Sequence, residues 1–425
     1  MINKSTCSSR RAATWVLFLV LCSAFCAGCR LGYRTPESAV TYGTEDRQES
    51  AYAVFENPDG TVLLVGFRYS FGAPGQSETF LLKVARTGEV LWEKPCGINR
   101  VPCGAVLAQD GSIIVGGDAA VVEDRHLYVA QIDRDGGVFW ETVIEGQGHE
   151  SGVAIAQSAD GRIGIVGTSY APGECADTDY ESDADVYLAC LDEAGEILWA
   201  ESFGGGRFDR ARALTATGDG GFVVAAQSNS FQTGTRLEGY VIKADGDGNF
   251  VWETILDPDD RVDERPYAVA ENVDGSILVA GGASGVQPEP SLANWDHLYL
   301  AKLDTAGNIL WESSIPGHRR MGRRTDVWAE AVFLPPGTNE ILAVGHAGTF
   351  NEIDTIHIAK TDGNGQLLWE NEVGDSRGNI WVESALLGAN GGPIVSGCLS
   401  HVTYGRGRND RDLYVVWLDA NGNAL

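Results

Sequence analysis

A short phrase that recurs along the chain limits the folds available to this sequence more than any other feature. LDTAGNILWE occupies residues 303–312, and related phrases place tryptophans at Trp92, Trp140, Trp199, Trp252, Trp311 and Trp369. The intervals between these tryptophans are 48, 59, 53, 59 and 58 residues. A period of this length predicts an array of similar structural units.

Each copy of the repeat has the pattern of four short strands. Before Trp311, two alternating segments at 266–272 and 276–282 flank an Asp-Gly turn, and a third at 297–304 leads through an Asp-x-x-Gly turn into the tryptophan strand. Alternation bounded by such turns predicts antiparallel hairpins. The high glycine count of 54 also fits a turn-rich β protein.

Three further columns of the repeat hold small or aromatic residues. Alanine recurs at Ala53, Ala105, Ala154, Ala213, Ala268, Ala331 and Ala385. An aromatic residue or histidine recurs at Phe80, Tyr128, Tyr187, Tyr240, Tyr299, His357 and Tyr414. Glycine closes the apolar strand at Gly66, Gly116, Gly167, Gly281, Gly345 and Gly397, with Ala226 in the fourth copy.

Seven copies of four strands predict an all-β fold, a seven-bladed β-propeller of four-stranded antiparallel blades over residues 38–425. Alanine suits an innermost strand, where blades crowd, and tryptophan can fill the wedge between blades at the outside. A β-solenoid is the alternative architecture, but its repeats are usually shorter and lack paired Asp-Gly hairpins.

The last copy of the repeat is incomplete. Residues 420–425 align with 306–310, one residue short of the expected tryptophan, and 38–43 align with 369–374. We therefore predict that the outer strand of the seventh blade is shared by the N- and C-termini, which would close the ring and protect the sheet edges.

The N-terminal region has the features of a signal peptide. Basic residues precede the apolar run 15–27, which is too short to span a bilayer, and Ala27-Gly28-Cys29 resembles a bacterial lipobox. We predict a signal peptide at 1–28, lipidation of Cys29, a linker at 29–37, and export to a bacterial membrane, the outer membrane or the cell surface. The alternative is plain cleavage that leaves Cys29 unmodified.

Net charge and cysteine content restrict the possible partners and the possible disulfides. The net charge of −28 argues against a nucleic-acid partner. In an exported chain, Cys96 and Cys103 are a candidate disulfide across one loop, and buried free thiols are the alternative. The pairing of Cys175 with Cys190 and the state of Cys398 stay open.

LDTAGNILWE and its copies resemble the quinoprotein-type (PQQ-like) propeller repeat, which also occurs in cofactor-free bacterial envelope lipoproteins. The order Gly281-Gly282, Tyr299 and Trp311 also resembles kelch repeats. The resemblance covers residues 38–425 through short motifs, and it implies a propeller. It does not extend to the quinone, because the chain has no adjacent cysteine pair, so no cofactor is predicted.

The loop after the tryptophan strand carries an Arg-x-acid pattern. Its members are candidates for a charged collar at the mouth of the channel: Arg47, Glu49, Arg207, Asp209, Arg261, Asp263, Arg324, Asp326 and Arg377. Such a collar could grip a polar ligand or peptide. The alternative is that each arginine fixes its own loop.

The loops between the second and third strands of each copy vary and carry aromatic residues, a composition that suits recognition of protein or carbohydrate. The candidates are Tyr69, Phe71, Tyr170, Tyr180, Phe231, Trp295, Phe350 and Tyr404. In the alternative, these rings fold back onto their own blades.

An acidic segment at 174–185 is a weak candidate for calcium through Asp177, Asp179, Asp183 and Asp185, with a solvated acidic loop as the alternative. The sequence shows no nucleophile elbow, zinc-protease motif or phosphate loop. Acids near the predicted mouth (Glu49, Glu150, Asp209 and Glu264) could pair as glycosidase carboxylates.

These features favour a monomeric, lipid-anchored, non-catalytic propeller that binds an envelope protein or a glycan. Two alternatives come from other classes. One is an enzyme on the same scaffold, either quinone- or metal-dependent or a glycoside hydrolase, and the other is a purely structural envelope component.

Overall fold

The computed structural model describes residues 35–43, 47–70, 77–98, 100–121, 124–146, 148–170, 183–231, 237–256, 263–284, 296–317, 319–320, 323–348, 354–401 and 411–425. The predicted signal peptide and Cys29 lie outside these ranges. None of the described residues belongs to a helix long and apolar enough to cross a membrane.

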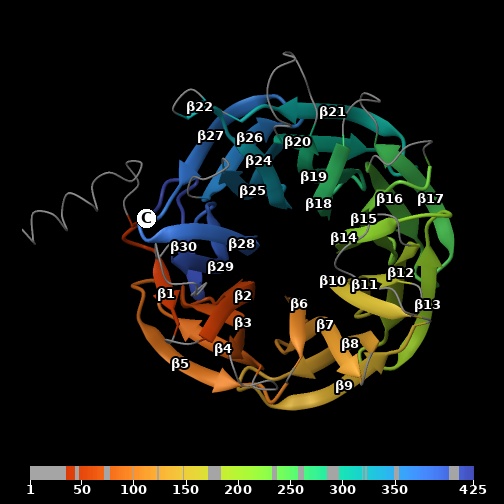
Figure 1. The fold of residues 1–425 in the computed structure, drawn as a ribbon, viewed down its shortest axis with the longest axis horizontal. Coiled ribbons are helices and arrows are strands. Elements are labelled where there is room, and N and C mark those ends of the chain that lie inside the picture. The colour runs from red at the N-terminus through yellow and green to blue at the C-terminus, as the bar shows by residue number, and fades with distance from the viewer. Residues whose placement is uncertain are drawn as a thin grey trace, which may run out of the picture.

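The described strands form four-stranded antiparallel groups set around a central axis, the arrangement of a β-propeller (Figure 1). Five of these groups are separate sheets. An eight-stranded sheet contains two more, joined by the parallel pairing of Gln48 with Arg411. Each group is called a blade below and is identified by its strands. The all-β prediction is confirmed, and the described sheets indicate about seven blades.

Within each blade the chain runs from the axis outward. The innermost strands are β2 (Arg47–Glu56), β6 (Val101–Leu107), β10 (His149–Gln157), β14 (Asp209–Ala216), β18 (Asp263–Glu271), β24 (Asp326–Phe333) and β28 (Gly378–Leu387). The second strands are β3 (Val62–Ser70), β7 (Ile113–Val121), β11 (Ile163–Tyr170), β15 (Phe222–Ser228), β19 (Ile277–Ser284), β25 (Glu340–Gly348) and β29 (Pro393–His401).

The third strands are β4 (Glu78–Val84), β8 (Asp124–Ile132), β12 (Ala184–Leu191), β16 (Glu238–Ala244), β20 (Asp296–Leu303), β26 (Thr355–Asp362) and β30 (Arg411–Trp417). The outer strands are β5 (Val90–Pro95), β9 (Val138–Ile144), β13 (Ile197–Phe203), β17 (Phe250–Leu256), β21 (Ile309–Ile315), β27 (Leu367–Val373) and β1 (Val40–Tyr42). A small hairpin, β22 (Arg319–Arg320) and β23 (Arg323–Arg324), lies outside the blades.

The hydrophobic core lies between neighbouring blades. The second and third strands are buried on both faces, and their side chains interdigitate with those of the next blade. In one cluster, Leu278 and Leu300 pack with Val327 and Ile341 of the following blade. Each blade therefore depends on its neighbours to bury its apolar faces.

The closure of the ring follows the register expected from the sequence. Val40 of β1 pairs with Val415 of β30, so the N-terminal segment supplies the fourth strand of the β28–β30 blade. The backbone oxygen of Trp417 accepts hydrogen bonds from the Ser38 hydroxyl at 3.0 Å and from the Leu425 amide at 3.1 Å. The two ends of the described chain thus meet on one carbonyl group, at the rim marked C in Figure 1.

Tryptophan on each of several outer strands locks its blade to the turn of the next blade. The Nε1–H of Trp252 donates to the Thr305 oxygen at 3.2 Å, and Thr254 donates its hydroxyl to the Gly307 oxygen at 2.6 Å. Gly307 has a φ of +83°, and a Cβ there would lie 2.7 Å from the Trp252 ring. This contact requires glycine both for its backbone conformation and for its lack of a side chain.

The same contact recurs around the ring. Trp311 donates to the Gly363 oxygen at 3.2 Å, and Ser313 donates to the Gly365 oxygen at 2.9 Å. At the C-terminal turn, the Asn371 side chain donates to the Gly422 oxygen at 3.0 Å. The incomplete last copy of the repeat therefore supplies a turn that the preceding blade needs.

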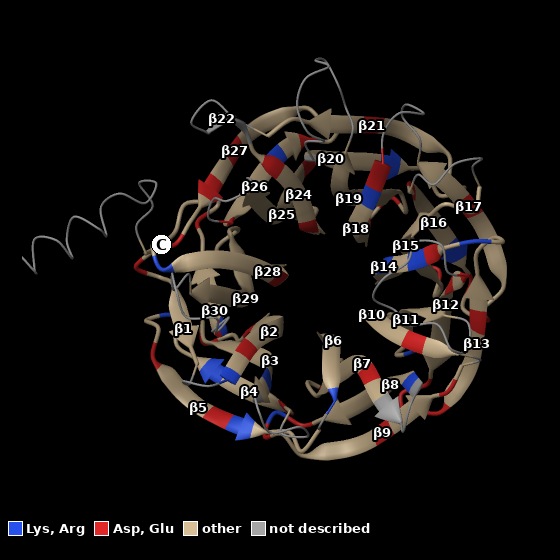
Figure 2. Ribbon diagram, in the orientation of Figure 1, with Lys and Arg blue, Asp and Glu red and all other residues tan. Residues whose placement is uncertain are grey.

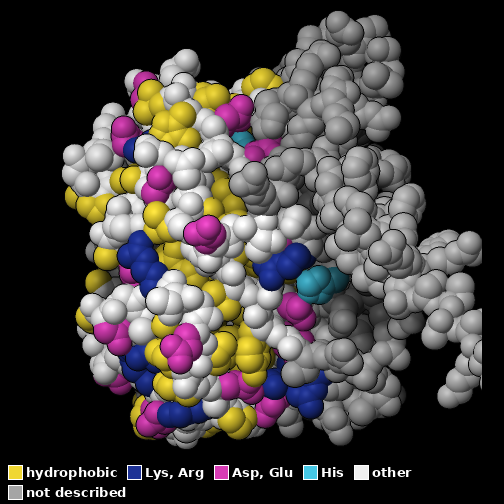
Figure 3. All heavy atoms as spheres, turned by 90° about the vertical axis from the view of Figure 1, so that its left-hand side faces the viewer, with side chains coloured by type: hydrophobic (Ala, Val, Ile, Leu, Met, Phe, Trp, Pro, Cys, Tyr) yellow, Lys and Arg dark blue, Asp and Glu magenta, His cyan; other side chains and the backbone are white. Residues whose placement is uncertain are grey.

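The remaining residues of the phrase also serve the scaffold. Asp304 accepts the backbone N–H groups of Ala306 and Asn308, each at 2.9 Å, which closes the turn. Glu312 accepts a hydrogen bond from the hydroxyl of Tyr299 at 2.5 Å. Ile309 and Leu310 are exposed on the outer strand β21. On the side of the molecule that Figure 3 shows, hydrophobic and charged side chains are interspersed.

The predicted Cys96–Cys103 disulfide is wrong in this structure, because both thiols are free. Cys96 follows an outer strand and packs with Ile98 and Ile113 between blades, whereas Cys103 lies on innermost strand β6. One loop joins them in sequence, but that loop crosses from the outside of one blade to the inside of the next. Cys190 and Cys398 are also free and buried.

Replacing Trp311 by alanine tests the interblade contact. We expect W311A to lower the free energy of unfolding by about 2–4 kcal/mol, because it removes a half-buried ring and one hydrogen bond. Leu310→Ala is the matched control, since Leu310 is 56% exposed, and it should change stability by less than about 0.5 kcal/mol. Equal effects of the two substitutions in urea denaturation would contradict the assigned role of the tryptophan.

Candidate functional site

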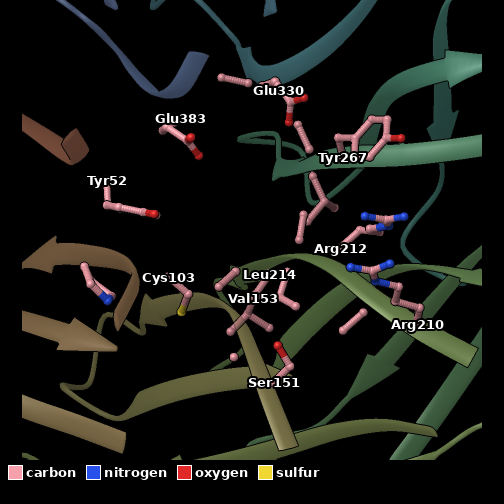
Figure 4. Close-up of a pocket in the computed structure, with 18 of the residues that line it drawn as sticks. Tyr52, Cys103, Ser151, Val153, Arg210, Arg212, Leu214, Tyr267, Glu330 and Glu383 are labelled. Carbon is pink, nitrogen blue, oxygen red and sulfur yellow. The ribbon is translucent and has the colours of Figure 1, made fainter. Parts of the chain in front are cut away.

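An open cavity of about 650 Å³ lies at the inner edges of the blades (Figure 4). Each innermost strand sends one residue toward it from the same place in the repeat. These residues are Tyr52, Cys103, Val153, Arg212, Tyr267, Glu330 and Glu383. A volume of this size is in the range of small-molecule sites in proteins.

A β-bulge places each of these residues. The pairing of every innermost strand with its neighbour skips one position, for example between Ala329 and Ala331, and the skipped residue is the one that lines the cavity. A bulge leaves its extra residue outside the ladder and turns it away from the sheet. The flanking residues stay in the ladder, so their small size serves packing.

Glycine on the second strand makes room for the bulge. A Cβ at Gly345 would lie 2.0 Å from the Trp328 backbone oxygen, and a Cβ at Gly281 would lie 2.0 Å from that of Arg265. Both oxygens belong to the residue two positions before the bulge. The repeated glycine column is therefore explained by close approach of the bulged backbone.

The observed register corrects the sequence alignment in two blades. Gly104 and Ser384, rather than Ala105 and Ala385, follow the bulge residue, and Gly117 rather than Gly116 occupies the glycine position. The alignment on alanine had therefore shifted these two copies by one residue toward the C-terminus. A slip of one residue exchanges the faces of a strand, so it concealed Cys103 and Glu383.

Two carboxyl groups enter the cavity from adjacent blades. Glu330 lies on β24 and Glu383 on β28, and Figure 4 shows both pointing toward the open space. Burial, with a smaller contribution from the nearby charge of Glu383, raises the pKa of Glu330 to about 7 against the opposing effects of Trp328 and Arg212. Burial likewise raises the pKa of Glu383 to about 7, against the lowering effect of Arg411. Both side chains therefore exchange protons near neutral pH.

Glu383 is exposed to solvent, yet its pKa responds to burial. The two observations agree because its accessible surface faces the cavity, and protein walls limit the water around it. Figure 2 shows acidic residues at the inner ends of β24 and β28 and basic residues on β14.

A buried histidine connects the two strands that carry these acids. The Trp328 indole donates to Glu330 at 2.8 Å and stacks on His346, with ring centroids 5.1 Å apart. His346 Nε2 accepts the backbone N–H of Val382 at 3.2 Å. Burial lowers the pKa of His346 to about 4, so the ring is neutral at pH 7 and can accept this hydrogen bond.

Two arginines line another part of the wall. Both Arg210 and Arg212 lie on β14. Arg212 donates its Nε–H to the Gln227 side chain at 2.7 Å, and its guanidinium lies 5.1 Å from the centre of the Tyr267 ring. These contacts hold the guanidinium in place beside the cavity, where it can attract an anion.

Tyr52 and Cys103 complete the wall on the side of β2 and β6. Burial raises the pKa of Tyr52 and that of the Cys103 thiol. Both groups are therefore protonated at neutral pH, and Cys103 has little character as a nucleophile.

The predicted charged collar is not a continuous ring of exposed groups. Glu49 and Asp209 are wrong as collar members, because both are fully buried. Asp209 accepts the Gly205 amide and the Ser230 hydroxyl, each at 2.7 Å, because the start of β14 lies under its neighbouring loops. Glu150 and Glu264 are equally buried, and Glu150 accepts the backbone N–H of Gly148 in its own loop at 3.1 Å.

The other collar residues have separate environments. Arg377 forms a bidentate contact with Asp375, at 2.9 and 2.7 Å, and donates to Thr41 of β1 at 3.0 Å. It therefore fixes its own loop, as in the alternative interpretation. The innermost strands β2, β18 and β24 begin at Arg47, Asp263 and Asp326. Arg207 is exposed. Arg261 and the side chain of Arg324 lie outside the described part.

The predicted aromatic surface is described at three positions. Tyr69 and Phe231 are exposed, and Phe231 lies 4.9 Å from the Tyr240 ring centroid. Tyr170 is not in an exposed loop, because it ends β11 and is buried with Phe208 and Leu237. Phe71, Tyr180, Trp295, Phe350 and Tyr404 lie outside the described residues.

Of the four aspartates predicted to bind calcium, the structure describes only Asp183 and Asp185. Asp183 and Asp185 line a second cavity of about 750 Å³, together with Glu145 and Glu201. The described residues contain no group of three or more acidic, histidine or cysteine side chains that could hold a metal. Asp177 and Asp179 fall outside the described ranges.

No protein-family model and no curated protein matches this sequence. Solved structures do match its fold. Polysaccharide lyase Uly1 matches with a TM-score of 0.53 and 10% identity over 93% of this chain and 95% of the lyase. The Pan2 WD40 domain of Neurospora crassa matches with a TM-score of 0.51 and 12% identity over 91% and 97%.

An α-L-arabinanase of Penicillium chrysogenum complexed with arabinobiose matches with a TM-score of 0.50 and 11% identity over 74% of this chain and 92% of the arabinanase. The chain is a β-propeller, like these neighbours. At such low identity, the likeness shows the fold and not the function.

The raised pKa values of Glu330 and Glu383 predict a pH-dependent contribution to stability. The folded chain holds these protons more tightly than the unfolded chain between the ordinary carboxyl value of 4.5 and about 7. The stabilising contribution is therefore complete below about pH 4.5 and is lost as the pH rises through about 7. Relative to the E330Q/E383Q variant, the wild type should lose stability over this interval.

Urea unfolding at a series of pH values from 5 to 8 measures this difference. The exposed-surface variant E196Q gives the background, since Glu196 lies in a solvent-exposed turn. A stability difference between the wild type and E330Q/E383Q that does not change with pH would contradict the assignment.

Proposed function

We propose that the protein is a seven-bladed propeller of the bacterial envelope that binds a polar ligand in its axial cavity without catalysis. The ligand is a small molecule or the end group of a glycan or peptide. The observation that carries this proposal is the convergence of one bulge residue from each innermost strand on the cavity. These residues vary in chemistry from blade to blade, whereas the flanking positions are nearly uniform and small.

This pattern separates recognition from folding. A position that served the scaffold would repeat its residue type in most blades, as the tryptophan and turn glycine do. The bulge position instead holds tyrosine, cysteine, valine, arginine and glutamate. Polar side chains that converge on a concave site from a rigid ring are suited to bind one ligand in a fixed orientation.

The envelope location is proposed from the N-terminal sequence. Lipidation of Cys29 would attach the propeller to a bacterial membrane through the linker 29–37, and β1 lies on the outer rim. A monomer held there by its rim leaves the cavity accessible to an envelope glycan or protein segment. The acidic composition supports such a partner over nucleic acid.

Ligand capture tests the proposal. The full chain, purified in detergent, is applied to arrayed bacterial glycans and synthetic envelope-derived peptides. We expect specific binding that falls at least about tenfold in the Val153→Trp variant, because the larger ring fills the cavity. Val251→Trp on the exposed rim is the matched control and should bind like the wild type. Binding that survives V153W would place the ligand elsewhere and overturn the assignment of the cavity.

A glycoside hydrolase is the second candidate, because Glu330 and Glu383 have pKa values near neutrality and enter one cavity. Such groups can serve as a general acid and a base. Turnover of arrayed glycans by the wild type, and its loss in the single variants E330Q and E383Q, would favour this candidate. Binding without turnover favours the non-catalytic function.

A further inference from the structure

The arginines and the glutamates of the axial cavity lie on separate blades, and Asp118 of β7, which also lines the cavity, accepts the backbone N–H of Gly152. Both arginines come from β14, and both glutamates come from the neighbouring strands β24 and β28. Tyr267 of β18 stands between the two sets in ring order, and Figure 4 shows the arginines and the glutamates on different parts of the wall. The cavity therefore has a cationic pole and an anionic pole.

Contacts within the cavity wall hold Arg212 and Glu330 in place. Gln227 and Tyr267 position Arg212, and the Trp328 indole positions Glu330. His346 couples the Trp328 ring to the backbone beside Glu383 through the Val382 amide. Because these groups are set before a ligand arrives, little conformational entropy is lost when it binds.

We propose that the cavity recognises a zwitterion, with the ligand carboxylate on Arg210 and Arg212 and the ligand ammonium group between Glu330 and Glu383. This inference rests on the proposed function of the cavity and names the chemical class of its ligand, which is an amino acid, a peptide or a sugar that carries both groups. A guanidinium pair suits a carboxylate because its N–H groups form charge-assisted hydrogen bonds. Two carboxylates suit an ammonium group because its three N–H donors need several acceptors.

A ligand with a single charge fits this cavity less well. A lone carboxylate would contact only the arginines, and a lone amine would contact only the glutamates, so each would forgo the charge-assisted hydrogen bonds of the other pole. A zwitterion compensates both poles at once, and so complementarity selects it over either half.

The proton affinity of the acidic pair gives an independent readout. The charge of Glu383 helps to hold the proton on Glu330. An ammonium group between them would favour the ionised form of both, so zwitterion binding near pH 7 should release protons to the buffer. Calorimetry in buffers of different ionisation enthalpy measures this release.

The test uses three probes of matched length: 6-aminohexanoate, hexanoate and hexylamine, titrated into the full chain at pH 7. Glycine and 8-aminooctanoate bracket the spacing between the charges. We expect one of the amino acids to bind at least about tenfold more tightly than hexanoate or hexylamine, which is the gain expected from a second charge-assisted contact. Its binding should release protons.

Two double variants assign the poles. E330Q/E383Q should reduce zwitterion binding to the level of hexanoate and abolish proton release. R210Q/R212Q should reduce it to the level of hexylamine while leaving proton release on binding. Because Arg212 also contacts Gln227 and Tyr267, R210Q alone and the charge-preserving R210K/R212K variant check that lost binding reflects lost charge.

The outcomes separate this inference from the proposed function. The zwitterion assignment is overturned if no amino acid in the series binds more tightly than hexanoate or hexylamine, and also if none of them binds at all. Either result leaves the proposed function standing if arrayed ligands bind the wild type and not V153W. Loss of the V153W effect overturns both.

Discussion

The structure depends on the contact between the tryptophan of one blade and the turn glycine of the next. A blade of four strands cannot bury its two faces alone, and the wedge between blades widens with distance from the axis. Trp252 fills that wedge against Gly307, and the hydroxyl of Thr254 binds the same turn. Because each contact joins consecutive repeats, the constraint passes around the ring and reaches the C-terminal turn at Gly422.

Closure of the ring is what makes the axial site rigid. β1 completes the last blade and pairs with β30, while the C-terminal turn receives Asn371 from the preceding blade. The two termini therefore perform different tasks in the same blade. With the outer contacts fixed, the innermost strands are held at set positions, and a bulge on each of them can present a side chain without loss of the ladder on either side.

The repeat divides the residues into two classes. Positions that meet the next blade, such as the tryptophan column, keep one residue type because the geometry of the contact is the same each time. The bulge position lies outside the strand ladder and lines the cavity, so Arg212, Glu330 and Glu383 could differ in type while the ladder on either side stayed intact. Trp328 and His346 lie beside the two acids, at positions where the residue type also varies from blade to blade.

Much of the scaffold could be predicted from the sequence, because it follows from local chemistry. Asp-x-x-Gly dictates a turn, alternation dictates a strand, and the alignment of 38–43 with 369–374 gave the register of closure that Val40 and Val415 show. The site could not be predicted in the same way. The variable position that precedes the alanine column could have indicated the cavity residues. The misalignment at Ala105 and Ala385 hid two of them, Cys103 and Glu383.

The sequence by itself determined the repeat, its strands and turns, and the residues that join one blade to the next, since these depend on neighbours at fixed spacing. Only the tertiary structure decided which side chains meet. Glu330 and Glu383 are 53 positions apart and Arg212 is more than a hundred positions from either, yet all line one cavity. The same distinction explains why Cys96 and Cys103 lie apart although they are close in sequence. Convergence depends on the closure of the ring and the direction of each bulge, and no local pattern of residues encodes either.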